Sequence, residues 1–88
     1  MDKHEAQEIA RQKLEELERD GFASLRQRID QVTTEDFTTD RGTTYNLECQ
    51  IFWDSQPNGA IRVVTSIDDG GWRSFFPLSV STIVEPME

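Results

Sequence analysis

A hairpin signal in the second half of the chain most constrains its fold. The valine-bearing residues 61–67 precede the turn-forming residues 68–71, and the aromatic residues 72–78 follow them. β-Branched and aromatic residues favour strands, whereas Asp and Gly accept the positive φ that a tight turn requires. The sequence therefore predicts two adjacent antiparallel strands that anchor a sheet.

The pairing of these strands depends on which residues form the turn. An Asp69-Gly70 turn places Ile67 opposite Trp72 and matches apolar with apolar along both strands. A turn shifted by one residue would instead place Ile67 opposite Ser74. Asp-Gly is also a preferred type I′ pair, so we predict the Asp69-Gly70 turn. The expected pairs are Ile67 with Trp72, Val63 with Phe76, Ile61 with Leu78 and Val64 with Phe75.

Alternation defines another strand over residues 44–53. Apolar residues occupy every second position, and polar residues fill most of the positions between them. Because successive side chains of a strand point to opposite faces, one face is predicted to enter the core and the other to meet water. The apolar positions are Tyr45, Leu47, Cys49, Ile51 and Trp53.

Turn chemistry connects this strand to the one before it. Residues 40–42, Asp-Arg-Gly, suit a three-residue hairpin loop with Gly42 in the left-handed region. Such a loop pairs Phe37 with Tyr45. Residues 34–39 are therefore expected to form a short edge strand.

The requirement that apolar residues share one sheet face also predicts the connection between residues 44–53 and the strand that starts at Ile61. Pairing Trp53 with Ile61 and Ile51 with Val63 keeps apolar residues on one face. Residues 54–60 then form a longer loop. The predicted sheet is a four-stranded antiparallel meander, and a further short strand through Val80 to Val84 is one option for the tail, residues 79–88.

The first twenty residues predict an amphipathic helix over about residues 3–19. They contain no Gly or Pro, and Asp2 and Glu5 have the spacing of an N-cap and its N3 partner. Gly21 suits the end of such a helix. The apolar stripe consists of Ala6, Ile9, Ala10, Leu14 and Leu17.

A short second helix is predicted over about residues 22–30, antiparallel to the first. Phe22, Leu25, Ile29 and Val32 recur at spacings of three and four residues, which is typical of a helix. A strand is the weaker alternative, because it would spoil the alternation. The expected fold is one α+β domain over residues 1–88, with both helices packed on the meander.

The charge balance narrows the classes of partner. Seventeen acidic and nine basic residues give a net charge of −8, which disfavours nucleic acid and anionic membranes. The charge is compatible with a basic protein partner or with solubility alone. No apolar run approaches the ~20 residues of a membrane span, and the single cysteine excludes an intramolecular disulfide. We therefore expect a cytoplasmic protein that binds neither nucleic acid nor membrane.

Catalytic and cofactor signals are weak. Cys49 falls on the apolar face of its predicted strand, where cysteine usually behaves as a small hydrophobe. The only histidine, His4, lies in the first turn of the N-terminal helix, and Gly70-Gly71 lacks the lysine of a phosphate-binding loop. The sequence therefore favours a non-enzymatic protein and indicates no cofactor.

Three aspartates form a candidate ligand site. Asp40, Asp68 and Asp69 belong to turns at the same end of the predicted meander. Hard cations such as calcium prefer several oxygen ligands, and these carboxylates could supply some of them. The alternative is that they only favour the turns, which is the more frequent role of aspartate at such positions.

Apolar residues on the nominally wet face of the sheet form a candidate interaction surface. Such a patch indicates either a second covering layer or a partner. Arginine is common at the energetic centres of interfaces, so the two arginines of this face are candidate anchors. The surface consists of Phe52, Arg62, Val64, Arg73 and Phe75.

The last half of the chain carries a recognisable string. Its segments are Phe52-Trp53-Asp54, Pro57-Asn58-Gly59-Ala60-Ile61-Arg62-Val63 and Ser66-Ile67-Asp68-Asp69-Gly70-Gly71-Trp72-Arg73-Ser74-Phe75-Phe76-Pro77-Leu78. This string resembles a pattern of small uncharacterised bacterial proteins. The resemblance implies a bacterial origin and a small α+β domain, and it implies no activity and no catalytic residues.

Together these features favour a non-enzymatic module that binds protein, either a separate partner or a second copy of itself. One alternative is a ligand- or metal-binding domain, or a small enzyme, centred on Asp40, Asp68 and Asp69. Another is an acidic inhibitor or immunity-type partner of a basic protein, which rests on the net charge alone.

Overall fold

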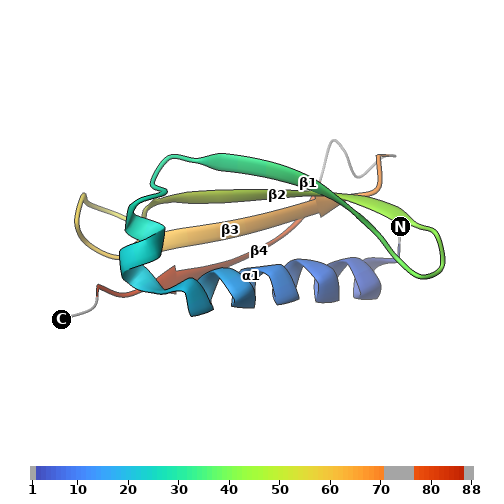
Figure 1. Ribbon diagram of the computed structural model, residues 1–88, viewed down its shortest axis with the longest axis horizontal. Helices are drawn as coiled ribbons and strands as arrows, with labels where there is room; N and C mark the ends of the chain where they lie inside the picture. The colour runs from blue at the N-terminus through green and yellow to red at the C-terminus, as the bar shows by residue number, and fades with distance from the viewer. Residues whose placement is uncertain (1, 71–76, 87–88) are drawn as a thin grey trace.

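The computed structural model describes residues 2–70 and 77–86. These residues form two layers, a helix and a four-stranded antiparallel sheet in the order β1-β2-β3-β4 (Figure 1). The architecture is α+β, as the sequence predicts. The elements are α1 (Lys3–Arg26), β1 (Val32–Thr38), β2 (Thr44–Trp53), β3 (Ile61–Asp68) and β4 (Leu78–Val84).

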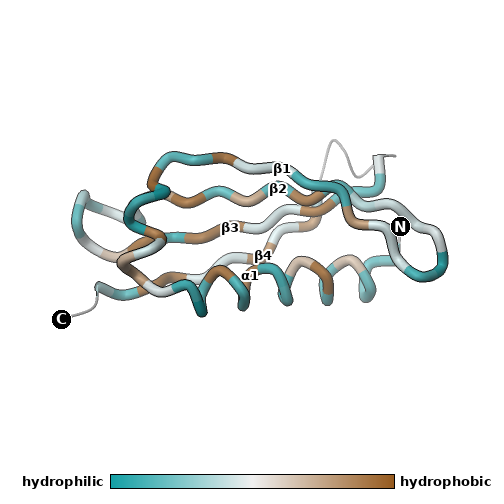
Figure 2. The backbone as a smooth tube through the Cα atoms, in the orientation of Figure 1, coloured by the Kyte–Doolittle hydropathy of each residue, from teal (hydrophilic) through white to brown (hydrophobic). Residues whose placement is uncertain are grey.

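The start of α1 follows the predicted capping pattern. Asp2 is the N-cap residue, and its Oδ1 atom accepts a 3.0 Å hydrogen bond from the backbone N–H of Glu5. The apolar stripe faces the sheet, as the hydropathy colours of Figure 2 show. Its buried members in the first five turns are Ala6, Ala10, Leu14 and Leu17.

The predicted separate helix over residues 22–30 is wrong. The helix α1 continues to Arg26 through a kink at Gly21, whose φ of 84° and ψ of 163° are non-helical. Phe22 and Leu25 are buried against the sheet beyond the kink, so tertiary packing extends the helix where the glycine suggested an end. Residues 27–30 form a turn that leads into β1.

The predicted hairpin between β1 and β2 is confirmed. Phe37 stands opposite Tyr45, and the N–H of Thr39 donates to the carbonyl of Thr43 at 2.9 Å. Gly42 adopts the expected positive φ, at 86°. The strand begins at Val32, two residues earlier than expected.

The predicted register between β2 and β3 is also confirmed. Trp53 pairs with Ile61, and Ile51 pairs with Val63. The loop between the strands is closed by a 2.9 Å hydrogen bond from the N–H of Asp54 to the carbonyl of Ala60.

The predicted register between the third and fourth strands is wrong. The strand β3 pairs with Leu78–Val84, so that Ile67 faces Leu78 and Ile61 faces Val84. The strand considered for the tail is therefore the fourth strand itself, and no tight Asp69-Gly70 turn joins it to β3. Trp72, Phe75 and Phe76, the other expected partners of β3, lie outside the described residues.

The alternation within β4 explains this register. Leu78, Val80 and Val84 lie on the face toward α1, where they pack against the two core clusters. Ser79 and Ser81 lie on the open face together with the exposed Ile83, and Ser79 shares a 2.9 Å hydrogen bond with Ser66 of β3. The strand thus supplies a mainly apolar face toward α1 and a mixed face on the open side.

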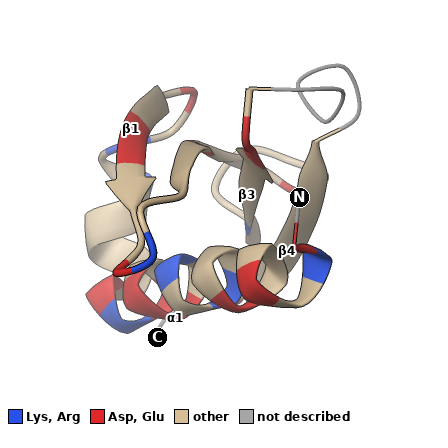
Figure 3. Ribbon diagram, turned by 90° about the vertical axis from the view of Figure 1, so that its right-hand side faces the viewer, with Lys and Arg blue, Asp and Glu red and all other residues tan. Residues whose placement is uncertain are grey.

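The helix covers only part of one sheet face. It packs chiefly on β3 and β4, contacts β2 at few points and leaves β1 at its side (Figure 3). The core lies between α1 and the inner strands. The helix-side face of β1 is therefore left uncovered by α1.

No described helix combines the length and hydropathy that a membrane span requires. The helix α1 is amphipathic rather than uniformly apolar.

Candidate functional site

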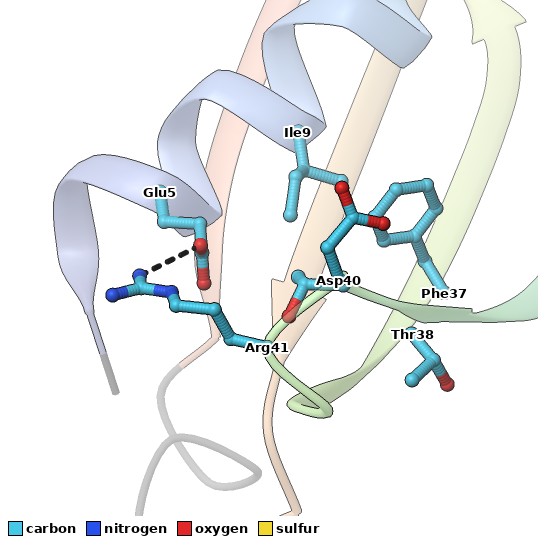
Figure 4. Close-up of a pocket in the computed structure, with 7 residues that line it drawn as sticks. Glu5, Ile9, Phe37, Thr38, Asp40 and Arg41 are labelled. Atoms are coloured by element: carbon cyan, nitrogen blue, oxygen red, sulfur yellow. Dashed lines mark hydrogen bonds and ion pairs between the residues drawn. The ribbon is translucent and has the colours of Figure 1, made fainter.

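A groove runs between α1 and β1 because the helix is displaced toward the other edge of the sheet. Two adjoining hollows, with volumes of about 400 and 240 Å³, share Ile9 of the helix and Phe37 of the strand. Figure 4 shows the larger of the two. We call this feature the α1–β1 groove. It is lined by Glu5, Ile9, Lys13, Glu35, Phe37 and Asp40.

An exposed aromatic residue forms one wall of the groove. Phe37 lies on the face of β1 toward the helix layer, yet 44% of its surface is exposed. Its cross-strand neighbour Tyr45 is covered by α1 and only 1% exposed. The same sheet face is therefore buried on β2 and open on β1.

Ion pairs fix the charged ends of the groove. Arg41 donates a 3.0 Å hydrogen bond to Glu5 Oε2, and the hydroxyl of Tyr45 donates a 2.8 Å hydrogen bond to Glu5 Oε1. The Arg41 guanidinium, followed by the Tyr45 hydroxyl, lowers the pKa of Glu5. Burial, reinforced by the Glu5 carboxylate, raises the pKa of Tyr45 to about 12.

A second ion pair joins α1 to β1 at the smaller hollow of the groove. Lys13 Nζ of α1 lies 3.0 Å from Glu35 Oε1 of β1, and this contact raises the pKa of the lysine. Both basic side chains of the groove, Lys13 and Arg41, are thus held by carboxylates. Asp40 differs, because no ion pair or hydrogen bond with a residue in the described ranges engages its carboxylate.

Three residues of the predicted interaction surface lie on the open face of the sheet. Phe52 and Arg62 are cross-strand partners, and Val64 follows on β3. Arg62 donates to Asp54 Oδ1 at 2.8 Å, so the arginine is anchored rather than free. The other two members of the predicted surface, Arg73 and Phe75, lie outside the described residues.

Sequence reasoning missed two members of this face. Val32 is 57% exposed beside Gln50, and Ile83 is 41% exposed beside Arg62. The sequence predicts Val32 from helical spacing and Ile83 as part of the tail, whereas strand alternation places both on this face. We define the open-face patch as Val32, Phe52, Val64 and Ile83.

The three aspartates of the predicted ligand site have separate surroundings. Asp40 lines the α1–β1 groove, and Asp68 Oδ1 accepts a 2.9 Å hydrogen bond from the N–H of Gly70. Asp69 follows the end of β3. Across residues 2–70 and 77–86, no three His, Cys, Asp or Glu residues form a group that could hold a metal ion.

The cysteine lies in the core. Cys49 is 4% exposed, and burial raises the pKa of its thiol. A raised pKa leaves little thiolate at neutral pH, so the thiol is a poor nucleophile. Its cross-strand partner is Thr65, which is also fully buried.

Comparison of the chain with protein-family models, with curated proteins and with solved structures gives no match. The resemblance to small bacterial proteins therefore stays a prediction.

Proposed function

We propose that this chain is a non-enzymatic protein-interaction module that binds its partner through β1 and the α1–β1 groove. One observation carries the proposal: all seven residues of β1 are exposed. An edge strand presents unpaired backbone groups, and proteins commonly either protect such an edge or use it for binding. The adjoining groove supplies apolar surface through Ile9 and Phe37.

The charged groups of the groove support binding rather than proton transfer. A general acid or base works best with a pKa near the operating pH. The pKa of Glu5 is lowered by Arg41 and that of Lys13 is raised by Glu35, so both stay ionised near neutrality. They act as fixed charges in ion pairs.

Site-directed photo-crosslinking tests the proposal. A photoreactive phenylalanine analogue at position 37 should capture one protein, whereas the same analogue at Glu18, exposed on α1, should not. The captured protein, once purified, should bind the native chain and lose at least about tenfold in affinity for Phe37→Ser, or about 1.4 kcal/mol. Equal capture from both positions, or unchanged affinity of Phe37→Ser, would overturn the proposal.

A second candidate function is self-association through the open-face patch. Its four apolar side chains occupy neighbouring strands around Arg62, and two of them are among the large exposed apolar residues of the described chain. A symmetric dimer could cover this patch in both copies. Light scattering over a range of concentrations should then show a dimer that Ile83→Lys disrupts and Thr38→Lys, at the polar end of the same face, preserves.

An acidic inhibitor or immunity-type protein is a special case of the leading proposal. Such a protein would bind a basic partner, and the net charge of −8 supports that direction. The distinction depends on what the partner does, which the crosslinked protein would reveal.

A further inference from the structure

We propose that the partner contributes an extended segment that pairs with β1 as a fifth strand and alternates basic with apolar residues. The inference rests on the proposed function and specifies the chemistry of the bound segment. Backbone geometry, edge charge and the shape of the α1–β1 groove each support one part of it.

The backbone of β1 is available for pairing. Hydrogen bonds at both ends of the β1–β2 ladder involve odd-numbered residues, Thr39 with Thr43 and Gln31 with Ile51. In an antiparallel pair, residues that bond to the partner alternate with residues whose N–H and C=O groups point away. The outward groups therefore belong to Thr34, Asp36 and Thr38, on a strand with every residue exposed.

The charge of this edge disfavours a second copy as the added strand. Figure 3 shows acidic residues in the middle of β1, namely Glu35 and Asp36. Antiparallel pairing of two β1 strands about their middle would place Glu35 opposite Glu35 or Asp36 opposite Asp36. Like charges directly opposite one another destabilise a sheet, whereas opposite charges stabilise it. A strand with lysine or arginine facing Asp36 is therefore the complementary occupant.

The two faces of β1 favour different residues in an added strand. Asp36 points to the open face and, among the described residues, its carboxylate accepts only a 3.2 Å hydrogen bond from the neutral amide of Asn46. Phe37 points to the groove and has exposed apolar surface next to Ile9. An added strand would thus place a basic residue opposite Asp36 and an apolar residue opposite Phe37.

The charges of the groove support the same arrangement of side chains in the added strand. Glu35 is already paired with Lys13 at 3.0 Å, so the groove side needs no second cation there. The preferred segment therefore alternates basic side chains on one face with apolar side chains on the other.

Three capped eight-residue peptides test the inference. One alternates Lys and Val, one alternates Glu and Val, and one is the Lys–Val peptide with N-methyl groups on every second amide. Fluorescence anisotropy at physiological salt should show Lys–Val binding at least tenfold tighter than Glu–Val. N-methylation should weaken binding at least tenfold, because it removes the donors that a ladder requires. Amide chemical shifts should change along β1 and the groove.

Charge-reversed variants provide the matched control. Asp36→Lys should bind Glu–Val more tightly than Lys–Val, whereas Glu18→Lys, the same charge change on an exposed site of α1, should keep the native preference. Equal binding of the two peptides, or no effect of N-methylation, would overturn the inference. If position 37 crosslinks a partner but no peptide binds, the inference fails and the proposed function stands. If neither occurs, both fail.

Discussion

The hydroxyl of Tyr45 donates a 2.8 Å hydrogen bond to Oε1 of Glu5, which joins β2 to the first turn of α1. The other carboxylate oxygen accepts a 3.0 Å hydrogen bond from Arg41 in the β1–β2 loop. The start of α1 and the β1–β2 hairpin, which are distant in the sequence, thus meet at one carboxylate. The contact satisfies a buried phenol and fixes one end of the α1–β1 groove.

The titration of Tyr45 should report this contact directly. Burial and the Glu5 carboxylate raise the pKa of Tyr45 from 10.0 to about 12. Because the chain has a single tyrosine, tyrosinate absorbance follows this residue alone. The midpoint should lie near pH 12 in the folded protein and near 10 in urea. A midpoint near 10 in both conditions would contradict the contact.

The same shift predicts a loss of stability in alkali. The pKa of Tyr45 is higher in the folded than in the unfolded chain, so its stabilising contribution is complete at a pH below the unfolded pKa of 10. This contribution disappears as the pH rises from 10 toward 12. Urea unfolding across this range should show a steeper loss for the native chain than for Tyr45→Phe. The phenylalanine variant keeps the ring and lacks the titrating hydroxyl, so it isolates this group.

The lowered pKa of Glu5 predicts a loss of stability in acid. Arg41 and then Tyr45 lower the pKa of Glu5 from 4.5, so its contribution is present above that value and disappears as pH falls through the folded pKa. Glu5→Gln should therefore lose less stability than the native chain on acidification below pH 4.5. Glu18→Gln, at an exposed position, is the control and should follow the native curve.

Local patterning was enough to predict half of the sheet. The Gly42 turn and the alternation of residues 44–53 fixed the β1–β2 register, and face consistency fixed Trp53 opposite Ile61. A shift by one residue would have moved each apolar side chain to the wet face. Because of this penalty, the requirement that apolar residues share one sheet face predicts the strand register reliably where turns are short or one face is strongly apolar.

The fourth strand shows where that reasoning fails. Two runs that followed β3, residues 72–78 and Leu78–Val84, both offered apolar partners, and parity alone did not decide between them. The prediction compared only two turn registers of the aromatic run and placed the strand through Val80 to Val84 in the tail. The observed strand instead places Leu78 and Val80 toward α1 and Ser79 on the open face, so coverage by the helix determines the choice.

The groove could not be predicted because it depends on where the helix lies. Sequence patterns identified the apolar stripe of α1 and the edge position of β1. They did not show that α1 packs on β3 and β4 and leaves Phe37 exposed. Asp40 was noticed as a turn residue, and its place in the groove emerged only from the packing.

Substitution of Gly21 by alanine should destabilise the protein, whereas the same substitution stabilises a regular helix. In a regular helix, Gly→Ala gains about 0.5–1 kcal/mol of stability. Gly21 has φ 84° and ψ 163°, a region that is essentially restricted to glycine, so Gly21→Ala should cost about 1–3 kcal/mol. Among the described residues, no side chain or backbone outside the immediate helix neighbours lies within 4 Å of the added Cβ, so the loss would report the local backbone conformation.

The control for this prediction lies two residues away. Ala23 is exposed and has regular helical geometry, so Ala23→Gly should cost about 0.5–1 kcal/mol. Chemical denaturation of the variants would compare both values. A stabilising Gly21→Ala would show that the kink is not maintained in solution.

Burial of Cys49 predicts slow thiol chemistry. The residue is 4% exposed and burial raises its pKa, so a thiol reagent should reach it only when the sheet opens. As the only cysteine, it can be followed by reagent absorbance. Native labelling should be at least about 100-fold slower than labelling in urea. Fast labelling of the native chain, matching an exposed Thr38→Cys control in a Cys49→Ala background, would contradict this placement.

Thr65 predicts a stabilising substitution in the centre of the core. Its Oγ1 atom is buried and has no hydrogen bond of standard geometry with the described residues, and the partner across the ladder, Cys49, offers only a weakly bonding thiol. Valine has nearly the same shape and no hydroxyl, so Thr65→Val should raise the free energy of unfolding by about 1 kcal/mol. Thr82→Val, at a half-exposed site on the same sheet face, should change it by less than about 0.5 kcal/mol. Urea unfolding of both variants provides the measurement, and a destabilised Thr65→Val would mean that the hydroxyl has a partner in solution.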